Sequence, residues 1–227
     1  GFNQLHDNGP QKSNTFSQEL RLTSPAGQRL AYVLGAYYSR AFSERIFTRN
    51  DEVCTATATA PSGVLIPCGS ANANPSTFPS ATADFGSTFN NVAVFGQATF
   101  KLADHIRLIG GLRYTHDKLD VFHIRRTTLA GPGINGNFDQ GVYDTGVSNG
   151  VPFRTGTSKD NLSGKAVLQA DLSRDVMAYA SYARGYKGPA YNIFFNLTAT
   201  GTNVIAPETS DAFEVGLKNT LFGGKLT

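Results

Sequence analysis

The residues best suited to chemistry in this sequence are few and stand apart. Its four histidines are dispersed, unlike the closely spaced ligands of a metal cluster. His116 and Asp117 are an adjacent histidine–acid pair, but a catalytic dyad also needs a nucleophile, and the sequence places none beside them. The glycines of GPGING at 131–136 have dinucleotide-loop spacing, yet no strand is predicted before them and no helix after them. The sequence therefore indicates no enzyme class.

The two cysteines, Cys54 and Cys68, are predicted to form a disulfide. They enclose a loop of 15 residues, which is short enough to bridge. In the chain-entropy model, closing such a loop stabilises a fold by roughly 3 kcal/mol. Disulfides persist in oxidising compartments, so the bond would indicate an exported protein. The alternative is two unpaired thiols in a loop. A zinc site is not indicated, because histidine partners are not nearby.

Composition and charge narrow the class of protein. The 227 residues include 20 lysines and arginines against 17 aspartates and glutamates, a net charge of +3, and the basic residues are scattered. That distribution does not resemble a nucleic-acid-binding surface. Glycine, phenylalanine and tyrosine number 24, 16 and 9 while tryptophan is absent, which favours β-structure with many turns. No apolar run reaches the length of about 18 residues that a transmembrane helix requires.

Alternation of apolar and polar residues predicts the strands that must position any site. In the segment 106–115, Ile106, Leu108, Leu112 and Tyr114 share one face, while arginines take the other. The same period-two pattern appears in six further segments, although both faces of 175–186 are mixed and its orientation is not predicted. These segments are 15–23, 29–40, 91–102, 161–172, 175–186 and 209–220.

The connections between these segments alternate between short and long. In an up-and-down antiparallel sheet, alternate connections lie at opposite ends of the strands, so the short turns share one end and the long loops the other. Transmembrane β-barrels show this asymmetry, with strands of about ten residues whose apolar face meets lipid. A soluble sandwich, with the apolar faces packed into a core, is the alternative. Short connections are predicted at 24–28, 103–105, 173–175 and 221–225, and long ones at about 41–90, 117–160 and 189–207.

Three stretches resemble the barrel of TonB-dependent outer-membrane receptors. IRLIGGLRYTHD at 106–117 is similar to the family's strand with Gly-Leu-Arg-Tyr-Thr followed by Asp. YASYARGYKGPAYN at 179–192 resembles its Gly-Tyr-Lys segment, and PETSDAFEVGLKNTLFGGKLT at 207–227 resembles its Pro-Glu run before a turn. Their order and spacing also match the family. The resemblance covers most of the chain from about residue 15, with the long loops unmatched.

The resemblance implies an all-β fold, an antiparallel up-and-down transmembrane β-barrel. Residues 1–227 would be a single partial β-barrel domain, a fragment of about seven strands from a barrel of 22, with the plug domain and the other strands absent. Each unpaired backbone group at an open sheet edge costs several kcal/mol in hydrocarbon. The fragment alone is therefore expected neither to insert stably nor to transport.

The resemblance also implies a function in the bacterial outer membrane. The whole protein would take up a small nutrient such as a ferric siderophore, a cobalamin or a glycan, energised by a TonB–ExbB–ExbD complex acting on the plug. Its other partners would be outer-membrane lipid and lipopolysaccharide; enzymatic activity, a cofactor, a metal site and nucleic acid are not implied. A passive porin and a soluble β-rich carbohydrate-binding module or extracellular enzyme are the alternatives.

Four residues are the candidate ligand-binding set: Arg184, Tyr186, Lys187 and Tyr191. The family holds ligand near the outer end of its strands, where these side chains are expected, and they would suit an anionic or catecholate-like ligand. Alternatively, the tyrosines belong to an aromatic girdle and the cations meet lipopolysaccharide or the plug. The charged residues of the inner face are expected to pair with one another or with the plug; they are Glu19, Arg21, Lys101, Arg107, Arg113, Lys165, Asp171, Glu214 and Lys218.

Overall fold

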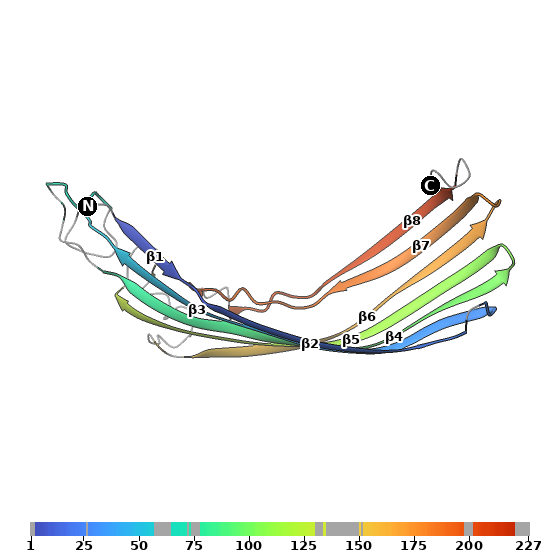
Figure 1. The fold of residues 1–227 in the computed structure, drawn as a ribbon, viewed down its shortest axis with the longest axis horizontal. Helices are drawn as coiled ribbons and strands as arrows, with labels where there is room; N and C mark the ends of the chain where they lie inside the picture. The colour runs from blue at the N-terminus through green and yellow to red at the C-terminus, as the bar shows by residue number, and fades with distance from the viewer. Residues whose placement is uncertain are drawn as a thin grey trace.

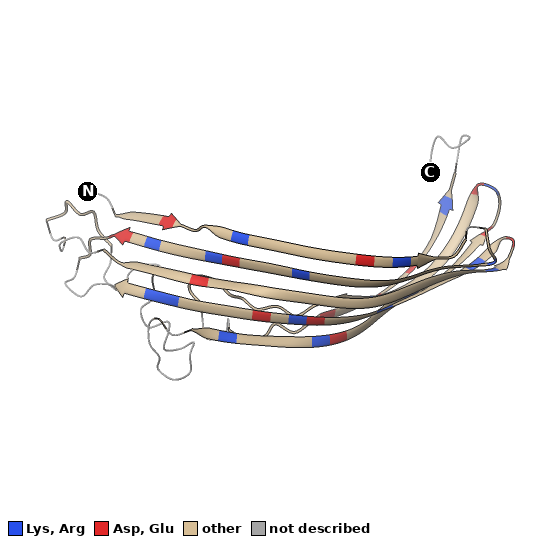
Figure 2. Ribbon diagram, turned by 60° about the horizontal axis from the view of Figure 1, so that its bottom comes forward, with Lys and Arg blue, Asp and Glu red and all other residues tan. Residues whose placement is uncertain are grey.

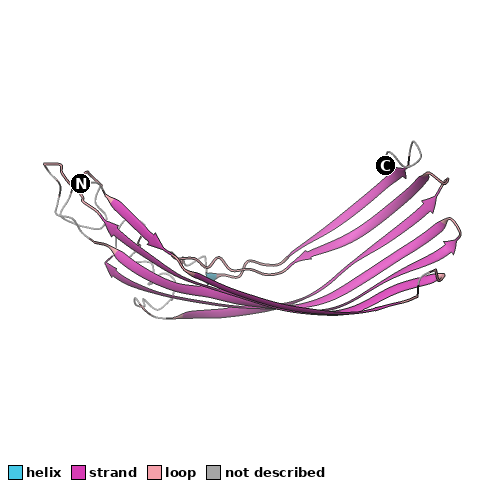
Figure 3. Cartoon of the chain, in the orientation of Figure 1, coloured by secondary structure: helices cyan, strands magenta, loops and turns pink. Residues whose placement is uncertain are grey.

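The fold is one curved antiparallel sheet, built almost wholly of strands (Figure 3). The computed structural model describes residues 3–25, 27–56, 65–71, 73, 78–129, 134, 150, 152–197 and 202–220. Within that part, no helix has the length and apolarity needed to cross a membrane. The predicted antiparallel all-β fold is confirmed. The strands are β1 (Gln4–Asn8), β2 (Gln11–Thr23), β3 (Leu30–Glu52), β4 (Ser80–Ala103), β5 (Ile106–Leu129), β6 (Phe153–Asp171), β7 (Val176–Lys187) and β8 (Glu208–Asn219).

The eight strands make seven rows, because β1 and β2 lie end to end along β3. Their partners on β3 continue one antiparallel register across the interruption at Gly9 and Pro10. Proline has no backbone N–H to give to a ladder. Its carbonyl still accepts a hydrogen bond from the amide of Ile46 at 3.1 Å, so the edge row stays in place. From there the order is β3, β4, β5, β6, β7 and β8.

The short connections gather at one end of the sheet. The turns that follow β2, β4 and β6 lie together with the end of β8, and the N-terminus lies at the opposite end (Figure 1). We call the first the turn end and the second the loop end. This is the segregation that the alternating connection lengths predict.

Four strands run well past their predicted bounds, so the predicted connections at about 41–90 and 117–160 are wrong in extent. β3 and β4 cover nearly half of the first, and β5 and β6 nearly half of the second. Beyond Tyr38 and Tyr114 the outer face becomes mainly polar, and the apolar outer stripe of the turn half does not continue. The ladder nevertheless continues, because cross-strand pairing satisfies the backbone whatever the side chains are.

Near the turn end, the outer face is apolar and exposed. Leu112 is 64% exposed, Leu162 57% and Val215 85%. Because these stripes do not pack against one another, the sheet is not one layer of a sandwich. The same surface includes the exposed Leu20, Leu22, Leu30, Leu34, Val92, Val94, Leu102, Leu108, Leu168, Leu172, Phe213 and Leu217.

The outer face changes character at a row marked by two cross-strand pairs, Tyr38 with Val92 and Tyr114 with Leu162, which are offset by one outer-face position because Tyr114 lies opposite Val94. We call the part between this row and the turn end the turn half, and the remainder the loop half. In the loop half the outer face carries charged and polar groups, and charged residues recur along this part of the long strands (Figure 2). The turn half thus has the surface of a lipid-facing band about ten residues tall, and the loop half that of a wall standing in water.

Candidate ligand-binding surface on the inner face

Residues 188–197, which follow β7, return across the inner face of the loop half; we call them the strap. Figure 1 shows this segment on the concave side of the sheet. The backbones of Ala190 and Ile205 exchange hydrogen bonds of 3.1 and 2.8 Å, which join the two legs of the β7–β8 connection. Leu197 is fully buried against Phe153 of β6. The strap is therefore packed onto the wall rather than free of it.

Phe195 anchors the strap in a cluster of arginines and aromatic rings. Its ring is 8% exposed and its centroid lies 4.8 Å from that of Phe47. The guanidinium carbons of Arg49 and Arg125 lie 5.5 and 5.7 Å from the same centroid, and that of Arg45 lies 5.2 Å from the Phe47 ring. Cation–π contacts of this kind contribute about 0.5–2 kcal/mol each.

Two of the three arginines have polar partners that fix their orientation. Arg49 donates to both carboxylate oxygens of Asp7, at 2.8 and 2.7 Å. That hydrogen bonding lowers the pKa of Asp7 and keeps the carboxylate charged. Arg125 donates from Nη1 to the Asn196 side-chain oxygen at 2.7 Å, which ties β5 to the strap. Arg45 differs, since its side chain is exposed toward a cavity.

His123 lies beneath the strap and is 1% exposed. Its Nε2 is 3.4 Å from the Phe195 carbonyl oxygen, and its ring stacks on Phe85 with centroids 6.0 Å apart. Burial lowers its pKa to about 4. At neutral pH the ring is therefore uncharged, and the carbonyl contact calls for the proton on Nε2.

A cavity of about 440 Å³ opens on the inner face between the strap and strands β2 to β5. Its wall combines a cation, hydrogen-bonding groups and aromatic rings. The Gln11 amide lies 3.5 Å from the Ser43 hydroxyl on this wall. The lining residues are Gln11, Ser43, Arg45, Phe85, Gly86, Ser87, Phe89, Leu119, Val121, Pro189, Ala190, Tyr191 and Ile193.

The four candidate residues from the sequence have different surroundings. Tyr191 lines this cavity. Arg184 lies on the outer face, 4.0 Å from the Asp211 carboxylate, and Lys187 lies 3.4 Å from Glu208. Tyr186 turns toward the buried Asp117. The structure thus brings Tyr191 to a cavity and pairs the two cations with carboxylates of β8.

Most of the cavity wall was missed by sequence reasoning. Arg45, Phe85 and Val121 fall in segments that the sequence assigned to long connections. A weak signal was present, since Phe85 and Phe89 keep an even spacing, as do Arg45 and Arg49. Even spacing keeps such residues on one face of a strand. In the loop half the apolar residues lie on the inner face, whereas in the turn half they lie on the outer face.

The inner face of the turn half is polar. Arg107 donates to Asp171 at 2.6 Å. The guanidinium of Arg113 lies 5.6 Å from the Phe95 ring centroid. The tip of that ring lies over Gly35, where an added Cβ would come within 2.2 Å of Phe95 Cζ. A side chain at this glycine would push the ring away and disturb the Arg113 contact.

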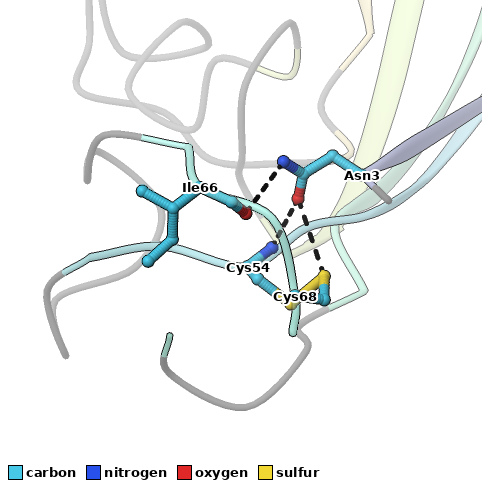
Figure 4. The surroundings of a disulfide bond; sticks show 4 residues. All are labelled: Asn3, Cys54, Ile66 and Cys68. Atoms are coloured by element: carbon cyan, nitrogen blue, oxygen red, sulfur yellow. Dashed lines mark hydrogen bonds between the residues drawn. A yellow bond between two sulfur atoms is a disulfide. The ribbon is translucent and has the colours of Figure 1, made fainter. Parts of the chain in front are cut away.

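A disulfide joins Cys54 and Cys68 at the loop end, with their Cα atoms 5.1 Å apart. Asn3 ties β1 to it, as Figure 4 shows. Its side-chain oxygen accepts from the Cys54 amide at 2.8 Å, and its Nδ2 donates to the Ile66 carbonyl at 3.2 Å. Asn3 therefore connects the edge row to the disulfide-closed segment that follows β3.

The adjacent histidine–acid pair does not form a reactive site. His116 lies on the outer face, 2.8 Å from Asp160, whereas Asp117 is 2% exposed on the inner face. Apart from Ile134, the GPGING segment lies outside the described residues. Among the residues that the structure describes, no group of three or more His, Cys, Asp or Glu could hold a metal.

Solved structures with the same fold are siderophore and ferric-chelate uptake receptors. The ferric yersiniabactin uptake receptor FyuA from Yersinia pestis aligns with a TM-score of 0.63 at 20% identity, over 95% of this chain and 27% of its own. The siderophore receptor PiuA from Acinetobacter baumannii gives 0.52 at 13%, over 95% and 30%. The ferric-catecholate import receptor Fiu from E. coli K12, in its closed form, gives 0.52 at 18%, over 96% and 30%. The chain thus spans less than a third of each receptor.

The family itself is shown by the sequence match. A family model described as "TonB dependent receptor-like, beta-barrel" matches residues 2–227. The members of this family are transport receptors of the bacterial outer membrane rather than enzymes. The lipid-facing outer stripe, the segregated connections and the open sheet agree with a piece of such a wall. The chain belongs to the TonB-dependent receptor family, as part of its β-barrel domain.

Proposed function

We propose that this chain forms part of the wall of an importer that takes up a small nutrient, with ferric siderophores as the substrate class. The three receptors named above are described as siderophore or ferric-chelate receptors, and they share this fold. Energy would come from a TonB–ExbB–ExbD complex acting through a plug domain of the whole protein.

The observation that supports this substrate class is the cavity beneath the strap. Arg45 offers an exposed guanidinium above the Phe47 ring, while Tyr191 and Gln11 offer hydrogen-bonding groups on the same wall. Ferric siderophores commonly carry negative charge and planar aromatic or amide groups. A guanidinium binds such oxygen-rich anions through charge-assisted hydrogen bonds.

Arg184, Tyr186, Lys187 and Tyr191 enter the proposal unequally. Tyr191 is already on the cavity, so it is the one for which we expect the largest effect on binding. Arg184 and Lys187 would have to leave Asp211 and Glu208 to hold a ligand. Their alternative role is to meet lipopolysaccharide at the outer surface.

The test measures binding and uptake by the full-length receptor. Arg45→Gln and Tyr191→Ala are compared with the matched variant Arg184→Gln, using a ferric catecholate complex as probe and cyanocobalamin as a second probe. We expect the first two variants to weaken binding of the ferric complex about tenfold or more, because each removes a charged or hydrogen-bonding partner. Arg184→Gln should change it less than twofold.

Uptake by cells with and without TonB then separates an importer from a passive pore. Loss of uptake without TonB supports the energised importer. Equal uptake with and without TonB would instead show a passive barrel. If cyanocobalamin binds and the ferric complex does not, the protein still acts as a nutrient receptor, but ferric siderophores are the wrong substrate class.

A further inference from the structure

A buried carboxylate on the inner face has no cationic partner. Asp117 of β5 is 2% exposed, and its Oδ1 accepts a hydrogen bond from Asn91 Nδ2 at 2.5 Å. Within the described part of the chain, no lysine, arginine or histidine forms an ion pair with it. An uncompensated buried charge is costly in a protein interior. Among these contacts, Asp117 therefore has a hydrogen bond and no compensating positive charge.

Three more polar atoms near this carboxylate are buried without a hydrogen-bond partner. They are Asn91 Oδ1, Asn161 Oδ1 and the hydroxyl oxygen of Tyr186. Asn91 lies directly opposite Asp117 in the β4–β5 ladder. Asn161 lies opposite Thr115, one inner-face position along β5. Such opposite and diagonal neighbours lie about 5–8 Å apart.

Tyr186 and the strap close the site from the other side. Burial and the neighbouring Asp117 carboxylate raise the pKa of the Tyr186 phenol, although the hydroxyl does not complete a hydrogen bond to that carboxylate. Gly188, the first residue of the strap, lies so close that an added Cβ would be 2.7 Å from Asp117 Oδ2 and 3.6 Å from Phe89 Cζ. Strands β4 to β7 thus contribute oxygen atoms to one place, and the strap backbone covers it.

We propose that these oxygens bind one hard metal cation, with Ca²⁺ as the best match. The available donors are the Asp117 carboxylate, two amide oxygens and a phenol, with no nitrogen or sulfur, and calcium takes such ligands in flexible geometry. Mg²⁺ fits less well because it retains several waters, and the unpartnered oxygens here are inaccessible. Since a single carboxylate supplies the charge, we expect a Kd of about 10⁻⁴–10⁻³ M.

Lys159 is the competing source of positive charge. It lies opposite Asp117 in the β5–β6 register, on the same face. Its side chain is exposed, and no ion pair joins the two residues. Replacing Lys159 therefore separates the two explanations. If Lys159 balances Asp117, its replacement should lower the stability of the protein; if a bound cation balances Asp117, the replacement should not.

The experiment uses the full-length receptor in detergent, with Tb³⁺ as the probe because a nearby tyrosine sensitises its emission. We expect saturable emission that Ca²⁺ displaces. Asp117→Asn should weaken Tb³⁺ binding at least tenfold, and Asn91→Leu should weaken it severalfold, since each removes an oxygen ligand. Asp160→Asn is the matched control, because it removes an exposed carboxylate beside Tyr114 on the outer face. It should leave the titration unchanged.

Thermal unfolding supplies a second readout that does not depend on emission. Ca²⁺ at 100 times its Kd should raise the unfolding temperature of the wild type and of Lys159→Met, because binding to the folded state stabilises it. The proposal is overturned if Asp117→Asn binds Tb³⁺ as the wild type does, or if Asp160→Asn loses the signal. It is equally overturned if Ca²⁺ has no effect while Lys159→Met lowers the unfolding temperature. Should Asp117→Asn fail to fold, Asn91→Leu and Lys159→Met decide by the same criteria.

Discussion

The turn half and the loop half are built from the same strands, yet their faces have opposite polarity. On β5, Leu112 points outward and Arg113 inward in the turn half, whereas Lys118 points outward and Leu119 inward in the loop half. The reversal follows from the surroundings. Lipid outside the turn half calls for an apolar outer face, while water outside the loop half calls for a polar one.

The two halves also differ in how they are stabilised. The turn half has exposed apolar residues and scattered inner ion pairs, and it depends on its ladder and on lipid. The loop half has a small core, with Ala81, Ala83 and Phe195 buried against Phe47 and Phe85. The strap supplies part of that core, so loss of the strap should loosen the loop half and leave the turn half intact.

The largest expected effect is at the strap anchor. Phe195→Ala in the full-length receptor should destabilise the docked strap by about 3–5 kcal/mol, because a buried aromatic ring is removed. Hydrogen exchange of the strap amides measures this. The neighbouring Phe194 is 37% exposed, so Phe194→Ala should change exchange far less. Equal acceleration in both variants would show that the strap is not anchored by Phe195.

Substituting arginine on the outer face should destabilise the turn half far more than the loop half. Leu112→Arg should cost about 2–4 kcal/mol, because it places a charge near the middle of the bilayer. Ser158→Arg, on the outer face of the loop half, should cost less than about 0.5 kcal/mol. Urea unfolding in liposomes and heat-modifiable gel mobility report the difference. If the ranking is reversed, the outer face of the turn half does not meet lipid.

The disulfide should matter to the loop half alone. Its cysteines are 14 positions apart, and closing such a loop contributes about 3 kcal/mol. A thiol count on unreduced protein should find neither Cys54 nor Cys68 reactive. Reduction should then speed hydrogen exchange in β1 and leave the turn half of β5 unchanged. Two reactive thiols before reduction would contradict the bond.

Acid should loosen the strap through His123. Its folded pKa of about 4 lies below the ordinary 6.5, so the unfolded segment takes up the proton more readily. Stability is therefore full above pH 6.5 and is lost as the pH falls toward 4, by about 2 kcal/mol at pH 5. Strap exchange at pH 7 and pH 5, corrected for intrinsic rates, measures this. His123→Leu should abolish the difference; an unchanged difference would show that His123 does not cause it. Asp51 and Asp84 could not explain such a loss, because burial raises the pKa of both carboxyls and acid then favours the folded state.

The smallest effect is expected at an inner ion pair of the turn half. Arg107 and Asp171 have side chains 31% and 34% exposed. Partly exposed pairs contribute about 0–1 kcal/mol, so Arg107→Met should shift unfolding by less than 1 kcal/mol. Urea unfolding of the full-length receptor checks this. A shift above 2 kcal/mol would mean that Arg107 also holds the plug.

The difference between lipid outside the turn half and water outside the loop half also explains how much of the fold could be predicted from the sequence. The strands of the turn half were predictable because every second residue points outward, and lipid requires apolar residues at these outer positions, as at Leu108, Leu112 and Tyr114. The orientation of β7 was not, since both its faces are mixed. The structure orients it through cross-strand contacts: the Tyr182 ring packs at a tilt against Phe213 outside, and the Tyr179 hydroxyl donates a hydrogen bond to Glu214 inside.

The sequence by itself determined the fold class, the family, the segregation of the connections and the lipid-facing stripe. Local period-two patterns predict the strands, their connections and the stripe, and short motifs indicate the family. Only the tertiary structure decided how far the strands continue and where the strap lies. In water the outer face is free to be polar, so only a weak local pattern marks the loop half. The cavity and the strap anchor depend on contacts such as His123 to Phe195, 72 positions apart, which arise only when the sheet has formed.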